Sequence, residues 1–280
     1  MLTRQLQRSF SNSGRVTRAR EETKLPLRTS MLTFAFEMKE QVVPYVASSL
    51  SKKKQVEQMF DRIAFRYDLM NHLLSFGIDV SWRKKIVKSL RLLQPKTILD
   101  VATGTADVAL LLSNLQAEKI IGIDISDEML EIGRKKIAEK NLSNKITLQN
   151  ADSENLPFEG NNFEAVTVAF GVRNFEHLEK GIQEIYRVLK PGGTFVVLEF
   201  SKPKHFPFKQ LYQFYFTTVC PLLGKWITRD KQAYQYLYRS VQVFPEGQKF
   251  LNILERMGFE QLQCKSLSFG ISSLYTARKP

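Results

Sequence analysis

The chain has 280 residues, of which 43% are hydrophobic and 25% are charged, and its formal net charge at pH 7 is +13. These proportions are those of a folded globular protein, and they exclude a wholly disordered chain and a collagen-like fibre. No run approaches the ~18 to 20 apolar residues that a membrane-spanning helix needs. The length corresponds to one large domain, or to one domain with an appendage.

The two cysteines, Cys220 and Cys264, provide neither a disulfide framework nor the paired cysteines of a zinc site. The sequence therefore indicates a reducing compartment, and we expect no metal. The positive charge suits an anionic partner, either a nucleic acid or an anionic membrane surface. Because no dense lysine and arginine cluster alternates with aromatic residues, we expect no nucleic-acid binding and interpret most of the excess as solvated surface.

Residues 1–37 are rich in arginine, serine and threonine and have no acidic residue before Glu21. We expect them to be a disordered extension of a single domain formed by residues 38–280. A mitochondrial transit peptide has such a composition and would place the protein in the mitochondrial matrix. The alternative that we favour is an early start codon ahead of Met31 or Met38, which goes with a cytoplasmic location.

Residues 52–93 have apolar side chains at helical spacing and are expected to form two or three helices, with a break at Phe76-Gly77. Short apolar runs separated by helical segments then predict a parallel, doubly wound sheet. The predicted strands are Thr97–Val101, Lys119–Ile125, Ile146–Asn150, Phe163–Phe170 and Thr194–Phe200. The predicted helices are Ala106–Leu115, Asp127–Lys140 with Ser126 as its N-cap, and Phe175–Leu189, ended by Pro191-Gly192-Gly193.

Residues 202–247 contain 11 of the chain's 31 aromatic residues, which is more than core packing alone explains. We therefore expect an insertion that acts as an aromatic-rich lid. After it, a helix is predicted over Phe250–Met257. Glu260–Ser268 and Gly270–Ala277 are predicted as a terminal pair of strands.

Residues 99–107 follow the first predicted strand and turn into a helix at the edge of the sheet where ligands of such folds bind. A dinucleotide fingerprint has three glycines, whereas this loop has only Gly104, and no P-loop lysine follows it. The loop therefore favours a nucleoside without phosphates. Asp124 ends the second strand, where a carboxylate can bind ribose hydroxyls, and Asp152 and Ser153 follow the third, placed to contact an adenine. Ordinary turns with solvated carboxylates are the alternative.

This arrangement resembles a class I S-adenosylmethionine-dependent methyltransferase. Three segments are similar to the ubiquinone/menaquinone C-methyltransferase family: Tyr67-Asp68-Leu69-Met70-Asn71-His72-Leu73-Leu74-Ser75 running to Trp82, Phe170-Gly171-Val172-Arg173-Asn174-Phe175, and Arg187-Val188-Leu189-Lys190-Pro191-Gly192-Gly193 running to Ser201. The similarity extends from about Met38 to the C-terminus. The family usually has a histidine four residues after the serine of the first segment, where this chain has Asp79, as in a bacterial menaquinone branch.

The resemblance implies a Rossmann-like doubly wound sheet with an antiparallel terminal strand, preceded by helices and carrying a lid. It implies S-adenosylmethionine as methyl donor, contacted by Thr105, Asp124, Asp152 and Ser153. The implied reaction is C-methylation of a polyprenyl quinol, from demethylmenaquinol to menaquinol. A 2-methoxy-6-polyprenyl-1,4-benzoquinol of ubiquinone biosynthesis is the alternative acceptor, and a non-catalytic scaffold of a quinone-synthesis complex is the alternative of a different class.

Methylation of a quinol ring carbon requires a base and a group that stabilises the phenolate oxygen. Asp107 is the candidate base, with stabilisation of a helix N-terminus as its alternative role. Arg173 is the candidate for the phenolate oxygen, because its guanidinium is always charged. Tyr67 is placed to donate to the other ring oxygen or to stack on the ring, with core packing as the alternative.

A polyprenyl quinol carries a long apolar tail, which gives the aromatic segment 202–247 a function. As a lid it would enclose the head group, exclude water and lead the tail toward the bilayer. A homodimer interface would use the same aromatic residues. The positive charge of the chain would assist peripheral contact with anionic lipid.

Overall fold

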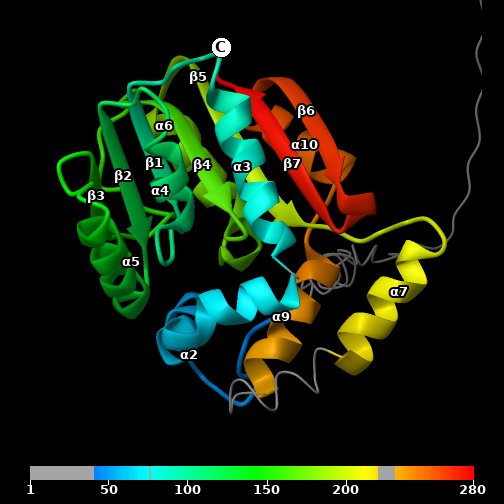
Figure 1. Cartoon of the computed structure of the whole chain (residues 1–280). Coiled ribbons are helices and arrows are strands. Elements are labelled where there is room, and N and C mark those ends of the chain that lie inside the picture. Colours follow the sequence, from blue (N-terminus) through cyan, green and yellow to red (C-terminus); the bar gives the residue numbers. More distant parts are fainter. Residues whose placement is uncertain (1–40, 76, 220–230) are drawn as a thin grey trace, which may run out of the picture. The chain divides into compact units, whose positions relative to one another are not determined.

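A seven-stranded sheet forms the centre of the computed structural model, which describes residues 41–75, 77–219 and 231–280, with 42–280 as one compact unit. The strand order is β3-β2-β1-β4-β5-β7-β6 (Figure 1). The bounds are β1 Thr97–Val101, β2 Lys119–Asp124, β3 Ile146–Asn150, β4 Phe163–Ala169, β5 Leu189–Phe200, β6 Glu260–Leu267 and β7 Ser272–Arg278. Strands β1 to β5 pair in parallel, whereas β7 is antiparallel to β5 and β6. The predicted doubly wound sheet with an antiparallel terminal strand is confirmed.

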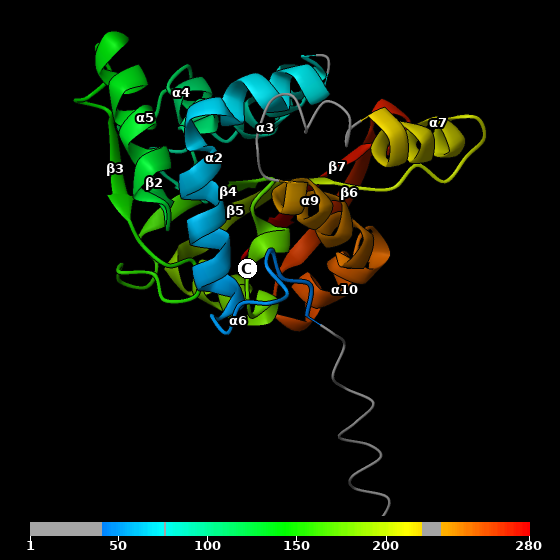
Figure 2. The ribbon, with the colours of Figure 1, turned by 90° about the horizontal axis from the view of Figure 1, so that it is seen from below.

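Helices cover both faces of the sheet (Figure 2). One face carries α3 (Ile78–Leu90), α4 (Asp107–Leu112) and α5 (Asp127–Glu139), and the other carries α6 (Leu178–Val188) and α10 (Gln248–Arg256). Alternate strand side chains point to opposite faces, so Ile98 of β1 packs with the first group and Leu99 with the second. Both side chains are fully buried, and the core therefore has two layers.

The remaining helices lie at the carboxyl ends of the parallel strands (Figure 1). They are α2 (Lys52–Leu74), α7 (Phe208–Phe214), a π-helix over Tyr215–Val219 and α9 (Lys231–Val243). Val56 and Met59 of α2 pack with Met129 of α5 and Tyr236 of α9 in a third, smaller core. Among the described helices, none has the length and apolar content needed to cross a bilayer.

The break predicted near Gly77 separates α2 from α3, and Gly77 itself is left-handed, with φ of 73°. Its neighbour Phe76 lies outside the described residues, as do Cys220 and the predicted extension 1–37. The expectations for those positions remain predictions.

Several predicted boundaries are wrong; for example, α4 ends at Leu112 and not at Leu115, and two other differences have a clear cause. Helix α6 begins at Leu178, because Val172–Asn174 form a 3₁₀ turn and Phe175 is extended, with ψ of 137°. Strand β5 begins at Leu189, before the Pro-Gly-Gly segment that we expected to precede it. Leu189 pairs with Phe163 and Thr194 pairs with Ala165, so the segment between them is an irregularity within the strand.

Asp100 lies buried near the end of β1, directly before the loop that leads to α4. Its carboxylate accepts hydrogen bonds from the hydroxyls of Thr103, at 2.6 Å, and Thr167, at 2.5 Å. Burial raises the pKa of Asp100 to about 6, although the two hydroxyls oppose the shift. The group therefore links the first turn of the loop to the neighbouring strand β4.

We expect an Asp100→Asn variant to change the pH dependence of stability. The aspartate loses its proton near pH 3.8 in the unfolded chain and near pH 6 in the folded chain. The contribution of this group to stability is therefore present below pH 3.8 and is lost as the pH rises through 6. Urea unfolding from about pH 4 to 7 should show wild type losing stability relative to the variant, whereas parallel curves would contradict this titration.

Candidate active site

The loop between β1 and α4 contains three left-handed residues. The angle φ is 54° at Ala102, 56° at Gly104 and 67° at Ala106. Such backbone costs a residue with a Cβ about 1–2 kcal/mol, whereas glycine adopts it freely. The Gly104 N–H donates to Asp124 Oδ2 at 2.8 Å. A Cβ built on Gly104 meets no atom within 4 Å, so this side of the loop faces open space.

Asp124 ends β2 with its carboxylate directed at this loop. Oδ1 accepts the Ser126 N–H at 3.0 Å, and Oδ2 accepts the Gly104 N–H. Burial raises the pKa of Asp124, while these backbone hydrogen bonds oppose the rise. The Ile125 N–H acts on the same carboxylate, and the remaining lone-pair capacity of its two oxygens allows it to accept a hydrogen bond from a bound hydroxyl. The Ser126 hydroxyl accepts the Met129 N–H, which confirms the predicted N-cap of α5.

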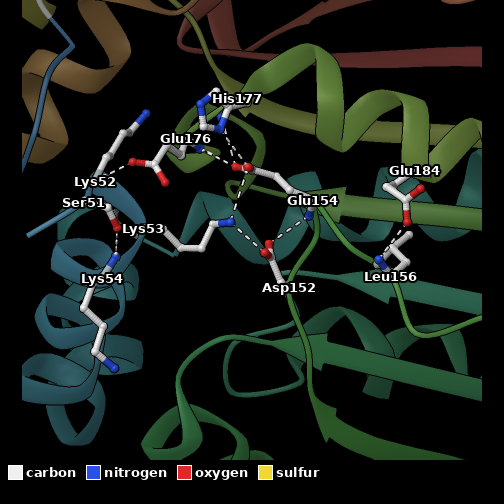
Figure 3. Close-up of polar contacts among 10 residues, drawn as sticks. All are labelled: Ser51, Lys52, Lys53, Lys54, Asp152, Glu154, Leu156, Glu176, His177 and Glu184. Atoms are coloured by element: carbon white, nitrogen blue, oxygen red, sulfur yellow. Dashed lines mark hydrogen bonds and ion pairs between the residues drawn. The ribbon is translucent and has the colours of Figure 1, made fainter.

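Asp152 and Ser153 follow β3 and face the same space as Asp124. Asp152 Oδ2 accepts Lys53 Nζ of α2 at 2.6 Å, and Oδ1 accepts the Glu154 N–H at 2.9 Å. Figure 3 shows Lys53 reaching the carboxylates of both Asp152 and Glu154. The end of β3 is therefore tied to α2 by a pair of opposite charges.

Glu154 is buried and gathers several donors (Figure 3). It accepts the backbone N–H groups of Glu176, at 2.7 Å, and His177, at 3.0 Å, and lies 3.0 Å from the His177 ring. Burial by itself raises the pKa of Glu154, but the hydrogen bonds from His177 and the charge of Lys53 hold it below its usual value. This carboxylate therefore joins three segments of the chain.

Lys52 joins the start of α2 to the segment after β4. Its N–H donates to Glu176 Oε1 at 2.9 Å, and its Nζ donates to the carbonyls of Phe175, at 2.8 Å, and Arg173, at 3.3 Å. Burial lowers the pKa of Lys52 to about 8. Sequence reasoning missed this residue and Lys53, because lysines at the start of a helix normally face solvent and their partners are distant in sequence.

The three strand ends and α2 together line one cleft. Its polar wall includes Gly104, Asp124, Asp152 and Ser153. Apolar side chains of Ile125, Met129 and Phe175 complete it. A carboxylate beside an open glycine suits a ribose, and the apolar side chains suit a purine, so the cleft fits the adenosyl group of S-adenosylmethionine.

A second cavity, mostly apolar and about 440 Å³ in volume, lies beside the cleft. Aromatic residues of α2, α3, β5, α7, α9 and the segment after β4 line it: Phe60, Tyr67, Trp82, Phe170, Phe200, Phe208, Tyr212, Phe214 and Tyr236. Four residues line both spaces: Phe60, Tyr67, Phe170 and Asn174. Molecules bound in the cleft and in the cavity would therefore meet at these four side chains.

Arg173 places a buried guanidinium on the wall of this cavity. Nη1 donates to Glu199 Oε1 at 2.8 Å and to the carbonyl of Phe170. Burial raises the pKa of Glu199, and the charge of Arg173 opposes the rise. Arg173 Nε is buried and has no hydrogen-bond partner in the described part of the chain, which is rare for a buried donor.

Asp79 and Arg83 form a buried ion pair on the same cavity wall. Arg83 Nη1 donates to Asp79 Oδ2, and Ser75 Oγ donates to Asp79 Oδ1 at 2.6 Å. Burying such a pair is costly, so its place in an apolar cavity points to function. The sequence shows only that Asp79 departs from the family pattern, whereas the structure brings it to the cavity.

The structure brings most of the predicted site residues to these two spaces. Asp124, Asp152 and Ser153 line the cleft, Arg173 lines the cavity, and Tyr67 lines both. Their shared property is a position at or beyond the carboxyl edge of the sheet, as expected for this fold.

Thr105 and Asp107 are not brought to either wall. Thr105 Oγ1 donates to Asp68 Oδ1 at 2.6 Å. Lys136 Nζ of α5 donates to Asp68 at 2.5 Å, to Asp107 at 2.7 Å and to Thr105 at 3.0 Å. This cluster of four residues joins the loop and α2 to α4 and α5, and Asp107 also lies 3.9 Å from Arg83 of the cavity wall.

The sheet topology, the left-handed loop and the cleft define a class I S-adenosylmethionine-dependent methyltransferase. Solved structures of this class share the fold. The chain superposes on a putative S-adenosylmethionine-dependent methyltransferase from Methanococcus maripaludis with a TM-score of 0.59 and 20% identity, covering 79% of this chain and 94% of that one.

A sequence profile of the ubiE/COQ5 methyltransferase family matches residues 48–279. A demethylmenaquinone methyltransferase from Bacteroides fragilis is 48% identical over 241 residues, which are 86% of this chain and 98% of that protein. A ubiquinone/menaquinone biosynthesis C-methyltransferase from Geotalea daltonii is 44% identical over 230 residues, 81% of this chain and 97% of its own. The chain belongs to the ubiE/COQ5 methyltransferase family.

We expect Gly104→Ala to weaken S-adenosylmethionine binding by about tenfold or more, because the added methyl group enters the cleft and the left-handed backbone is strained. Gly77→Ala is the matched control. Its φ is +73°, its Cβ also meets nothing within 4 Å, and it lies outside the cleft. Calorimetric titration should show normal affinity for the control. Equal affinity of both variants would contradict the placement of the cleft.

Proposed function

We propose that this methyltransferase methylates a ring carbon of a polyprenyl quinol, converting demethylmenaquinol to menaquinol. The observation that carries the proposal is the apolar cavity that meets the donor cleft at Phe60, Tyr67, Phe170 and Asn174. Aromatic walls suit a flat ring, and an apolar cavity suits a prenyl tail. Relatives from Bacteroides fragilis and, at 40% identity, Porphyromonas gingivalis are named demethylmenaquinone methyltransferases, which supports the same acceptor.

The chemistry determines what the protein must supply. S-adenosylmethionine carries an electrophilic methyl group on a positively charged sulfur. Removing a proton from a quinol hydroxyl moves electron density onto the neighbouring ring carbon, which forms the new bond to the methyl carbon as the bond to sulfur breaks. The ring carbon then loses its hydrogen as a proton. The chain must therefore stabilise an oxyanion and accept protons.

Arg173 is the residue that we assign to the oxyanion. Its guanidinium is always charged, and the residue lines the cavity. Its buried Nε donates to no group in the described part of the chain. The ion pair with Glu199 fixes its orientation. Asn174, the next residue, lies where cleft and cavity meet, and its Oδ1 accepts the Tyr236 hydroxyl at 3.0 Å. An oxygen bound at Arg173 would therefore lie close to the junction.

Asp79 is the residue that we assign as proton acceptor, in place of Asp107. Asp79 lines the cavity as a carboxylate paired with Arg83, and the cavity is where the quinol ring would lie. Asp107 lines neither space and is paired with Lys136 at 2.7 Å, with Arg83 farther away at 3.9 Å. We assign Asp107 a positioning role, because that ion pair holds α4 against α5.

The other predicted residues receive roles from their positions. Tyr67 packs edge-on against Phe60, with ring centroids 5.7 Å apart, at the junction where the quinol ring would lie. Asp124, Asp152 and Ser153 are assigned to the donor, through its ribose and adenine. Thr105 acts on the donor only through the loop that it holds. That no metal takes part stays a prediction from the sequence.

A benzoquinol of ubiquinone biosynthesis is the second candidate acceptor. The relative from Geotalea daltonii is named for both ubiquinone and menaquinone biosynthesis, and the same aromatic cavity suits either ring. The pathway also bears on location. A naphthoquinol acceptor would support the predicted cytoplasmic location, and a benzoquinol acceptor would support the mitochondrial alternative. Both locations stay predictions.

Methyl transfer to short-tailed quinols tests the proposed function. The full chain is incubated with isotopically labelled S-adenosylmethionine and either reduced demethylmenaquinone or a reduced methoxy-benzoquinone, and the product mass is measured. We expect label on the ring carbon of the naphthoquinol. Transfer to the benzoquinol alone would move the protein to the ubiquinone pathway, and transfer to neither, with normal donor binding, would refute a quinol acceptor.

We expect Asp79→Asn to lower kcat by about 100-fold or more, since general bases contribute roughly 10²–10⁴-fold. Asp107→Asn is the matched control and should keep kcat within about tenfold of wild type, because Asp107 lines neither space. Donor affinity, measured by calorimetry, should be near normal in Asp79→Asn. A large loss of kcat in Asp107→Asn alone would return the role of base to Asp107.

A further inference from the structure

Four large apolar side chains lie exposed around α7 and the tip of the β6–β7 hairpin. Phe206 is 81% exposed, Leu211 59%, Phe214 61% and Phe269 69%. We call these four residues the apolar rim. Figures 1 and 2 both show α7 beside the hairpin tip, away from the centre of the sheet. Monomeric proteins rarely expose such a group of large apolar side chains unless it contacts a partner.

The hairpin tip is built to expose Phe269. Ser268 and Phe269 are both left-handed, with φ of 44° and 58°, which is rare for residues other than glycine and genuinely unusual for a bulky aromatic. The Phe269 ring stacks on Phe208 of α7, with centroids 3.9 Å apart and planes 4° apart. Strained backbone of this kind is found at functional positions, so the exposure of Phe269 requires an explanation.

The apolar rim adjoins the apolar cavity, because two of its four residues also line the cavity. Leu211 and Phe214 line the cavity although each is more than half exposed. Phe208, which stacks on Phe269, lines it as well. A long apolar tail extending from the cavity would therefore pass directly over the rim.

The charge of this segment identifies the partner. Residues 200–219 contain no aspartate or glutamate, but they contain three basic residues: Lys202, Lys204 and Lys209. Lys204 and Lys209 are exposed beside the rim. Aromatic and leucine side chains flanked by lysines, with no carboxylates, match the interface of an anionic bilayer, where each lysine near the surface contributes attraction.

A second copy of the chain fits this surface less well. A two-fold dimer contact places the same patch on both subunits, so the lysines of one rim would face those of the other. Residues 200–219 contain no carboxylate to pair with them. Charge complementarity therefore favours lipid over self-association.

We propose that the apolar rim docks on the surface of an anionic phospholipid bilayer, so that a quinol tail passes between the membrane and the cavity. The identity of the tail rests on the proposed function, whereas docking itself does not. The rim residues would enter the headgroup region, and Lys204 and Lys209 would lie among the lipid phosphates.

Vesicle flotation of the full chain tests the docking. Vesicles of phosphatidylcholine alone are compared with vesicles of phosphatidylcholine and phosphatidylglycerol. We expect binding to the anionic vesicles and a loss of about tenfold or more in a Phe206→Asp, Phe269→Asp variant and in a Lys204→Glu, Lys209→Glu variant. The matched control is Phe65→Asp, Leu92→Asp, two side chains that are 90% and 94% exposed elsewhere.

The outcomes separate docking from catalysis. Phe206 and Phe269 do not line the cavity, so the variant at these two positions should methylate a short-tailed soluble quinol at the wild-type rate. Only its activity on quinol embedded in vesicles should be lost. The docking would be overturned if the rim and lysine variants bound vesicles as well as wild type. It would also be overturned if the rim variant lost a dimer but kept its vesicle binding. Rim-dependent docking without methylation of any quinol would refute the proposed function and leave the docking intact.

Discussion

One helix, α2, contributes two of the four side chains that the donor cleft and the apolar cavity share, and polar and charged contacts hold it to the sheet along its length. Lys52 and Lys53 hold its start to Glu176, Asp152 and Glu154. Asp61 accepts the Ser126 hydroxyl near its middle, and Asp68 pairs with Lys136 near its end. Phe60 and Tyr67 lie between these contacts along α2 and line both the cleft and the cavity. The meeting of donor and acceptor therefore depends on these charges.

The anchors are effective because their charges are paired and hydrogen-bonded. A buried carboxylate such as Glu154 costs several kcal/mol unless donors satisfy it, and here two backbone N–H groups and a lysine do so. Removing one partner would leave the other buried without compensation. Asp107 and Thr105 also help to hold α2 in place, because both accept hydrogen bonds from Lys136, which pairs with Asp68 of α2. Their distance from the ligand spaces is thus a consequence of supporting α2.

The sheet could be predicted from the sequence, because strand periodicity is a local pattern. Its ligand-binding edge could be predicted as well, because the carboxyl ends of parallel strands meet at one edge. Asp124 and Asp152 follow from that rule. The β5 boundary was missed because Leu189 joins the strand through pairing with Phe163, a contact between distant segments. Lys52 was missed for the same reason, since its partners lie 121 to 124 residues away. Asp79 shows no local signal of its cavity, which forms only when α3, α7 and α9 assemble.

A crystal structure with S-adenosylhomocysteine and a short-tailed naphthoquinone bound together would test the central claim most directly. We predict the adenosyl group between Gly104, Asp124 and Asp152, and the ring in the aromatic cavity with one oxygen at Arg173. The ring carbon to be methylated should face the donor sulfur across the four junction residues. A ring bound outside the cavity, or a sulfur directed away from the junction, would contradict it.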